Sequence, residues 1–418
     1  MGIFKKKFNL LDHYVFPGFR PAQQILGVFG DPLARVITYA RTHKKSVCSK
    51  CGALQNGWYD RTIRRVRDLP CADTRIYLEL EIRRVDCKKC GTLGGERLNF
   101  LADNPHYTKR FAMLVGKRCN SETISDVAND LHLDWHAVKD MDKQYMRGQI
   151  ELAGMPGPKW VGLDEISIKK KPKLVYRIVA TDLGRRRAIW FGGHDRSMES
   201  MVEFYDWLGC KKSARIELMV MDMWEPFHTV AKEKAPRAGI LFDKFHIVTH
   251  LQDALNTVRI SEYKRLAGDG RKFIKGQKYT LLSNRENLST SGKRSLKMLL
   301  DANKRLNIAY VLKESFDQLW SYKTPAGARK FFEHWRARLK WQRLKPYESF
   351  ARLVDKHWDG IVTYCNLDGR IPLGFVEGFN NKIRTIQRRA YGIKDEEYLR
   401  LKILSCMLPL LKTVKLNT

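Results

Sequence analysis

The chain has 418 residues, which is long for one domain and predicts several. Its formal charge of +32 arises because 77 Lys and Arg residues face only 45 Asp and Glu residues. Such a charge is better explained by binding to a polyanion than by a need for solubility alone. The polyanion would be DNA, RNA or an anionic membrane surface. The membrane is disfavoured because the sequence has no run of about 18 apolar residues. An odd number of cysteines, nine, disfavours a disulfide framework, and the N-terminus has no signal-peptide layout, so we expect a reducing, cytosolic location.

Two Cys-x-x-Cys-Gly knuckles are the first strong motif along the chain. Their thiols belong to Cys48, Cys51, Cys87 and Cys90. Two thiolates two residues apart can bind one metal ion from a tight turn, and two such pairs complete a tetrahedral zinc site. Between the knuckles, residues 62–66 and 75–85 alternate like the strands of a hairpin, with Pro70 and Asp73 at its turn. We predict a zinc ribbon with one structural Zn²⁺; the alternatives are unconnected thiols or a redox motif, which would not come twice.

The pattern of residues 124–138 predicts a helix-turn-helix. One helix face would carry the apolar residues Ile124, Val127, Ala128 and Leu131. Asp134 suits the N-cap of the second helix, and His132 occupies the turn position that Gly most often takes. In such a motif the residues near DNA would be Trp135, His136, Lys139 and Lys143. The alternative is a plain helical hairpin that packs on its neighbours.

Strand signals dominate from residue 159 onward. We expect strands at residues 160–168, 174–180, 188–191, 216–221 and 239–242, and helices at 198–208 and 225–232. This order, βββαβαβ, matches an RNase H-like fold, in which the first strand is central and the fourth lies beside it.

Two aspartates fall on those neighbouring strands, Asp164 on the first and Asp222 at the end of the fourth. Two carboxylates at the end of a buried sheet repel each other unless a cation holds them. Mg²⁺ prefers such hard oxygen ligands, and Mn²⁺ can replace it. Two such ions stabilise both the attacking and the leaving oxygen of phosphoryl transfer. The pattern therefore predicts a two-metal site.

A third acid is expected from a helix that begins near Gly374. Glu377 is the best candidate, because it would share a helix face with Asn381, Arg384 and Arg388. The opposite, apolar face would carry Phe379, Ile383, Ile386 and Ala390. We expect DNA contacts from Asn381, Lys382, Arg384, Arg388 and Arg389. Asp359 and Asp368 are rival third acids, but each precedes a Gly, as in a turn. A further alternative is a solvated basic helix with an incidental Glu.

At these motifs the sequence closely resembles the bacterial insertion-sequence transposases of the IS-L-three family. The resemblance rests on the paired knuckles and on the stretches 162–165, 221–227, 242–246 and 375–392. It implies a DDE transposase with a zinc ribbon, a helix-turn-helix, and an RNase H-like core that is interrupted by a helical insertion. It also implies Asp164, Asp222 and Glu377 as the catalytic triad. Asp243 and His246 are family motif residues too, and Asp243 could support the site rather than bind metal.

We therefore expect an α+β multidomain protein. Its segments are an arm (1–45), a zinc ribbon (46–105), a helix-turn-helix domain (106–155), the first part of the core (156–250), a helical insertion (251–365) and the last part of the core (366–418). Its partners would be terminal inverted repeats, target DNA and a second copy of the chain, in the bacterial cytoplasm and at the nucleoid. Trp320, Trp335 and Trp341 of the insertion would grip flanking DNA or a second subunit. The rival functions are a nuclease of the same fold without strand transfer and a non-catalytic zinc-finger regulator.

Overall fold

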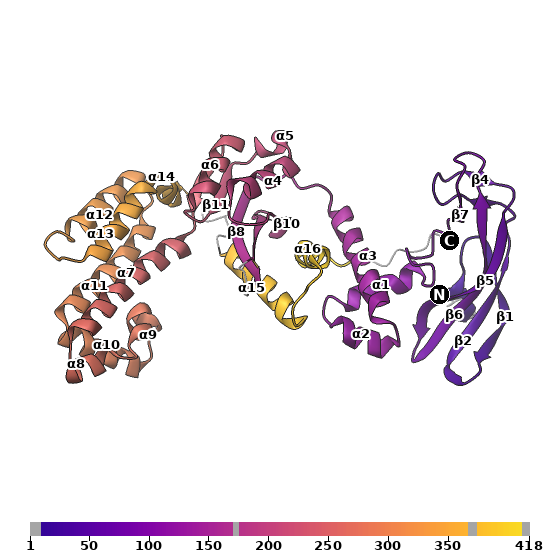
Figure 1. Ribbon diagram of the computed structural model, residues 1–418, viewed down its shortest axis with the longest axis horizontal. Coiled ribbons are helices and arrows are strands. Elements are labelled where there is room, and N and C mark those ends of the chain that lie inside the picture. The colour runs from indigo at the N-terminus through magenta and orange to yellow at the C-terminus, as the bar shows by residue number, and fades with distance from the viewer. Residues whose placement is uncertain (1–9, 170–174, 367–373, 412–418) are drawn as a thin grey trace, which may run out of the picture. The chain divides into compact units, whose positions relative to one another are not determined.

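The computed structural model describes residues 10–169, 175–366 and 374–411. The chain divides into two compact units (Figure 1). The first unit comprises Met1–Gly154 together with Ile386–Thr418, and the second comprises Met155–Thr385. None of the helices in the described ranges combines the length and the apolar character that a membrane span requires.

The first unit contains a five-stranded sheet in the order β1-β2-β6-β5, with β7 paired to β6. Its strands are β1 (Phe19–Val28), β2 (Asp31–Arg41), β5 (Asp60–Cys71), β6 (Thr74–Asp86) and β7 (Leu93–Gly95). The expected hairpin between the knuckles is present, because β5 and β6 pair antiparallel from Asp60 opposite Arg84 to Cys71 opposite Thr74. Alternate residues such as Leu78 and Leu80 are buried in the core of this sheet.

Residues 1–45 were expected to form a separate N-terminal arm, and the structure corrects this expectation for β1 and β2. These strands form a hairpin, and β2 pairs parallel with β6, so both belong to the ribbon's sheet. The reason is visible in β1, which is an edge strand exposed along nearly all of its length. Such a strand carries no alternating apolar pattern that a sequence could reveal.

Among the described residues, the α-helices that lie wholly within the first unit are α1 (Lys109–Arg118), α2 (Ile124–Leu131), α3 (Trp135–Ala153) and α16 (Glu396–Ser405). Asp134 caps α3 as expected, since its side chain accepts from the amides of His136 and Ala137. His132 holds the turn between α2 and α3 with a φ of 51°. The expected last segment of the core, 366–418, is divided, because α16 packs against α3 rather than against the second sheet.

The second unit is built on a five-stranded mixed sheet in the order β10-β9-β8-β11-β12. Its strands are β8 (Trp160–Lys169), β9 (Val175–Asp182), β10 (Arg187–Gly192), β11 (Leu218–Met221) and β12 (Gly239–Phe242). Strands β8, β9 and β10 pair antiparallel, whereas β11 pairs parallel with both β8 and β12. The five strands expected from the sequence are thus present with β8 central; Leu174, the expected start of the second, lies outside the described residues.

The two faces of this sheet are covered by different helices (Figure 1). On one face, α4 (Met198–Leu208) and α6 (Glu225–Lys234) pack on Val161, Leu163 and the odd-numbered residues of β11. On the other face, α15 (Phe375–Arg389) packs Val376 on Leu218 and Val220. A short helix, α5 (Cys210–Ser213), follows α4.

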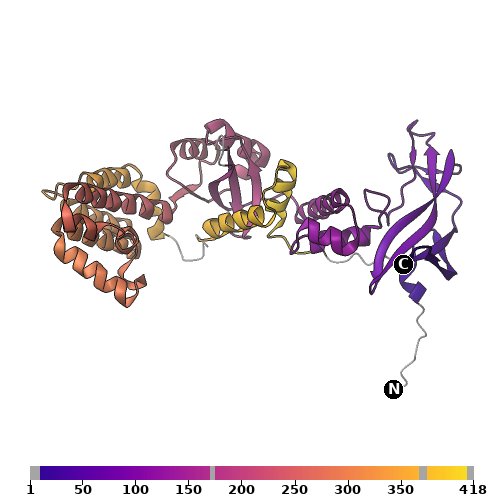
Figure 2. The same cartoon turned by 60° about the horizontal axis from the view of Figure 1, so that its bottom comes forward.

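Between β12 and α15 the described residues form helices and no strand (Figure 1 and Figure 2). The α-helices are α7 (Lys244–Arg265), α8 (Gly268–Ile274), α9 (Lys278–Leu282), α10 (Thr290–Ala302), α11 (Lys304–Phe316), α12 (Pro325–Ala337), α13 (Lys345–Lys356) and α14 (Trp358–Val362). Trp335 is 1% exposed, and its indole N–H donates to the carbonyl oxygen of Leu312. The expectation that Trp335 grips DNA or a second subunit is therefore wrong, because it belongs to the core of these helices. Trp341 is exposed.

Candidate functional site

The four cysteines of the knuckles are gathered at one point in the first unit. Their sulfur atoms all lie within 4.8 Å of one another. Each knuckle closes with the same turn, in which the amide of Gly52 or Gly91 donates to the carbonyl oxygen of Cys48 or Cys87. Both glycines have positive φ, 71° and 62°, which explains why Gly follows each Cys-x-x-Cys.

Local hydrogen bonds favour the thiolate at two of the four cysteines, whereas the neighbouring thiols raise the pKa of Cys51. Hydrogen bonds with Thr92 lower the pKa of the Cys90 thiol to about 6. Hydrogen bonds from its own knuckle, at Cys51 and Lys50, also lower the pKa of Cys48. The thiolate is the form that binds metal, and four thiolates at one point match the closed tetrahedral coordination of structural zinc.

In the second unit, strand alternation directs three aspartates to the face that α15 covers. Val220 of β11 contacts α15, so Asp222, two residues later, continues on the same face. Asp164 has the same parity as Gly162 on β8, and a Cβ atom on Gly162 would lie 2.6 Å from Val376 of α15. The glycine is thus required for α15 to approach.

The register of the sheet brings Asp164 and Asp222 side by side. Strands β8 and β11 are parallel and their pairing ends with Gly162 opposite Val220, so Asp164 and Asp222 each follow this last pair by two residues. The two carboxylates are close enough for Asp222 to raise the pKa of Asp164. Asp243 follows β12, which is parallel to β11, so it lies at the same edge as Asp222. The Nδ1 atom of His246 is 3.5 Å from a carboxylate oxygen of Asp222.

These carboxylates are poorly compensated. Burial raises the pKa of Asp164 to about 6; the nearby Asp243 and Asp222 raise it further, whereas His246 and a hydrogen bond from Asn380 oppose the rise. Burial also raises the pKa of Asp243. Neighbouring carboxylates with raised pKa values are costly to ionise together, and a bound divalent cation would stabilise their ionised form. The donor set is all oxygen apart from one imidazole, which fits Mg²⁺ or Mn²⁺.

Glu377 lies exposed in the first turn of α15. The apolar face expected for this helix is present in part, since Phe379 and Ile383 are buried while Ala390 is exposed. Within the described ranges, the four thiols form the only group of three or more Cys, His or acidic ligand atoms that lie within 4.8 Å of one another. Glu377 is therefore not gathered with Asp164 and Asp222 into a closed ligand set. Its role stays a prediction, and the rival Asp368 lies outside the described residues.

Asn380 is the site residue that the sequence analysis missed. Its side-chain amide donates to a carboxylate oxygen of Asp164 at 2.5 Å. Its position, one residue after Phe379 and three before Ile383, lies within the buried stripe of α15. An amide inside an apolar stripe is the signal that could have identified it.

The expected DNA-binding residues of α3 fall into two pairs. Trp135 and His136 are exposed at the start of the helix. Lys139 and Lys143 instead form ion pairs with Asp395, each at 2.8 Å, and Lys143 also pairs with Glu397 at 2.9 Å. The two lysines are thus engaged by the N-terminal end of α16, which the sequence analysis did not foresee.

The expected DNA-binding residues of α15 are exposed: Asn381, Lys382, Arg384, Arg388 and Arg389. Arg384 donates to the side-chain oxygen of Asn381 at 3.1 Å. Two exposed aromatic residues flank the aspartates: Trp224 follows Asp222 by two positions, and Phe245 precedes His246.

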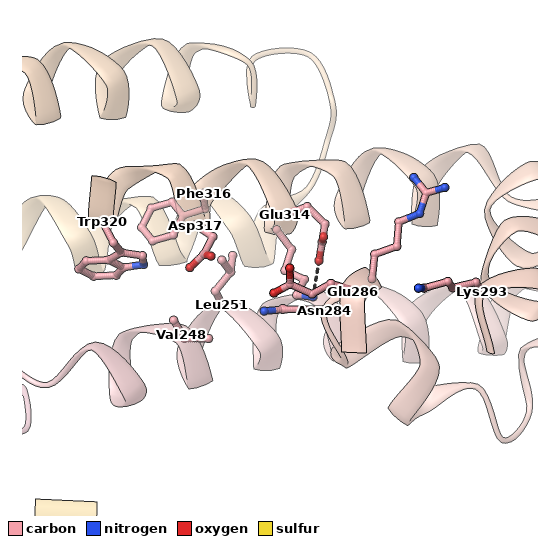
Figure 3. Close-up of a pocket in the computed structure, with 11 residues that line it drawn as sticks. Val248, Leu251, Asn284, Glu286, Lys293, Glu314, Phe316, Asp317 and Trp320 are labelled. Carbon is pink, nitrogen blue, oxygen red and sulfur yellow. Dashed lines mark hydrogen bonds and ion pairs between the residues drawn. The ribbon is translucent and has the colours of Figure 1, made fainter. Parts of the chain in front are cut away.

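A separate cavity of about 570 Å³ lies among the helices that follow β12 (Figure 3). It is lined by groups of both signs, including Lys293, Lys313, Glu314 and Asp317, and by Trp320. Lys313 pairs with Glu314 inside it. None of the aspartates of the sheet lines this cavity, so it is not part of the carboxylate site.

Comparisons with known proteins agree with this organisation. Residues 44–90 match a family described as zinc-finger of transposase IS204/IS1001/IS1096/IS1165, and residues 96–146 match the helix-turn-helix domain of transposase family ISL3. Residues 161–403 match the transposase family of the same group. The zinc ribbon and the DNA-binding helix-turn-helix expected from the sequence are thereby confirmed.

Two curated relatives cover most of the chain. The chain is 33% identical over 379 residues to the transposase for insertion sequence element IS1001 of Bordetella parapertussis, covering 89% of this chain and 92% of that one. It is 25% identical over 395 residues to the transposase for insertion sequence element IS1557 of Mycobacterium tuberculosis, covering 88% and 87%. The chain therefore belongs to the ISL3 family of insertion-sequence transposases.

Proposed function

We propose that this transposase binds the terminal inverted repeats of its own insertion sequence and cleaves and joins DNA at the carboxylate site. Asp164, Asp222 and Glu377 would form the catalytic triad. The sheet order β10-β9-β8-β11-β12 supports an RNase H-like core, and the helices α7 to α14 would be its insertion. The observation that carries the proposal is that Asp164 and Asp222 each lie two residues beyond the last pair of β8 and β11, on the side of the sheet where α15 packs.

Each element would have a separate part in recognition. The zinc ribbon and the N-terminal end of α3 would read the inverted repeat, with Trp135 and His136 nearest the bases. The exposed cations of α15 would hold phosphates beside the carboxylates. One structural Zn²⁺ would hold the knuckles, and a second copy of the chain would bring the other end of the element.

The reaction would proceed in two phosphoryl transfers. In the first, water attacks the phosphodiester at the element end and the 3′-hydroxyl leaves. In the second, that hydroxyl attacks a phosphodiester of the target DNA and displaces the 3′-oxygen of the target strand, without a covalent protein–DNA intermediate. Two Mg²⁺ or Mn²⁺ ions, when bound, supply the charge that stabilises the attacking and leaving oxygens. The carboxylates of Asp164 and Asp222 would hold these ions, while Lys382 and Arg384 would orient the strand.

The test is a strand-transfer assay with labelled DNA that carries the inverted repeat. The wild-type protein with Mg²⁺ should release a 3′-hydroxyl end and insert it into a supercoiled plasmid. The variant Asp164→Asn should bind the same DNA but yield neither product. Release of the end without insertion would show a nuclease of the same fold, and binding without either product would show a regulator.

A further inference from the structure

Asn380 has an unusual environment for an amide. Its side chain is 5% exposed and belongs to the buried stripe of α15. The amide nitrogen donates to Asp164, but the amide oxygen is buried and, among the described residues, has no hydrogen-bond donor. The next residue, Asn381, is exposed, and its amide oxygen accepts from Arg384.

A buried carbonyl oxygen without a donor costs about 1–3 kcal/mol. The hydrogen bond to Asp164 offsets part of this cost, whereas an apolar side chain such as Leu would leave no unpaired oxygen between its neighbours Phe379 and Ile383. An amide at this position needs a partner that supplies positive charge to its oxygen. The carboxylate of Asp164, which this amide contacts, calls for such a partner too, because Asp222 and Asp243 follow the neighbouring strands at the same edge of the sheet.

We propose that Asn380 is part of the divalent-cation centre. Its amide nitrogen fixes the carboxylate of Asp164, and its free oxygen receives the hydrated cation. Mg²⁺ usually keeps several water molecules when it binds protein, so an oxygen that accepts from such water contributes without replacing a carboxylate. This inference rests on the proposed function, since it assigns a residue to the same site. It makes Asn380, rather than a carboxylate, the group of α15 that directly contacts Asp164.

The test measures binding of Mn²⁺ to the full-length protein without DNA, by electron paramagnetic resonance and calorimetry. The number of sites lost in Asp164→Asn defines the site in question. We expect Asn380→Leu to weaken Mn²⁺ binding at that site at least about tenfold while the protein stays folded in metal-free buffer. Asn380→Asp, which keeps an oxygen at this position but loses the donor to Asp164, should bind Mn²⁺ more tightly than Asn380→Leu. The matched control Asn381→Leu should bind Mn²⁺ like the wild type.

Each outcome bears on one of the two proposals. Wild-type Mn²⁺ affinity in Asn380→Leu would overturn the assignment of Asn380 while the carboxylate site stands. Asn380→Ala repeats the measurement if the Leu variant does not fold, and normal binding by the Ala variant would overturn the assignment equally. If the wild-type protein had no Mn²⁺ site that depends on Asp164, both the assignment and the proposed metal centre would be wrong.

Discussion

The cysteine cluster of the first unit and the carboxylate cluster of the second are both candidate metal centres, but they are assembled differently. The four thiols already lie within 4.8 Å of one another, each pair held by a turn of five residues. The carboxylates come from the ends of separate strands, and in the described part of the chain no three of them gather as closely.

This difference is what the two proposed roles require. A structural zinc site is closed, so its ligands can be fixed by local turns. A catalytic site must leave coordination positions open for substrate oxygens, so its ligands cannot surround the ion completely. Carboxylates held close together also repel until the cation arrives, as the raised pKa of Asp164 indicates. The predictions below test whether the two centres really divide into one for folding and one for chemistry.

Zinc removal should have the largest effect and should be confined to the first unit. Structural zinc contributes on the order of 10 kcal/mol to the folding of the segment that binds it. We expect elemental analysis to find one zinc per chain and Cys48→Ser to lose it. Hydrogen exchange should then rise at the knuckles, at β3 (Ser46–Val47) and β4 (Leu54–Gln55), while the buried core of β6 stays protected. Full protection of the knuckles in zinc-free protein would contradict the structural role.

Glu377→Gln should have the opposite signature, with large loss of chemistry and no loss of folding. Gln keeps the shape of the side chain but removes the charge that helps to hold the second ion. We expect normal binding to end DNA and at least about a hundredfold slower cleavage and strand transfer, which corresponds to about 2.7 kcal/mol.

The matched controls for Glu377 are the rival acids. Asp359→Asn and Asp368→Asn should stay within about tenfold of the wild-type rate. Asp243→Asn is the stricter control, because Asp243 is partly buried at the same edge of the sheet as Asp222. An active Glu377→Gln together with an inactive Asp243→Asn would transfer the third position of the triad to Asp243.

The sequence predicted those parts of both centres that depend on short spacing or strand order. The metal-binding knuckles could be predicted because each Cys pair lies within one turn. Asp164 and Asp222 could be predicted because β8 and β11 must be neighbours in this strand order. Contacts between segments that are distant in the chain could not be predicted from the sequence. Nothing local to Lys139 indicates Asp395 as its partner, and the edge strand β1 has no buried face that would give a pattern. Asn380 was missed because an analysis of helix faces assigns polar residues to the solvent-exposed side.

Asp164→Asn should stabilise the metal-free protein although it abolishes catalysis. The native state holds the Asp164 proton with a pKa of about 6, well above the ordinary value near 3.8. The native state therefore binds this proton more tightly than the unfolded chain, and stability falls as pH rises from about 4 to about 6. The loss is about 3 kcal/mol at most, since each unit of pKa shift is worth about 1.4 kcal/mol. Denaturant titrations at pH 4.5 and pH 7.5 should show a smaller difference in the variant than in the wild type. If the free energy of unfolding changed equally with pH in the variant and in the wild type, the raised pKa of Asp164 would be contradicted.

The smallest effect is expected where the sequence analysis predicted a DNA contact, at Lys139 and Lys143. Both lysines pair with Asp395, and these pairs hold the pKa of that carboxyl well below its usual range. The contribution of the pairs is therefore present at neutral pH and is lost only as the pH falls below the ordinary carboxyl pKa. Beneath them, Tyr398 and Lys402 of α16 both contact the buried Asp142 of α3.

Because α16 is anchored in this way, the two lysines serve first to hold it on α3. Partly exposed pairs of this kind contribute about 0–1 kcal/mol each. We expect Lys139→Ala with Lys143→Ala to lower the unfolding temperature slightly and to weaken binding of end DNA by less than about threefold. Trp135→Ala with His136→Ala, at the uncovered start of the same helix, should weaken it by about tenfold, as measured by fluorescence anisotropy at fixed salt. If the lysine variant lost more affinity than the Trp135 and His136 variant, α16 would have to leave α3 when DNA binds, and the pairs with Asp395 would be a barrier to recognition rather than a part of the domain.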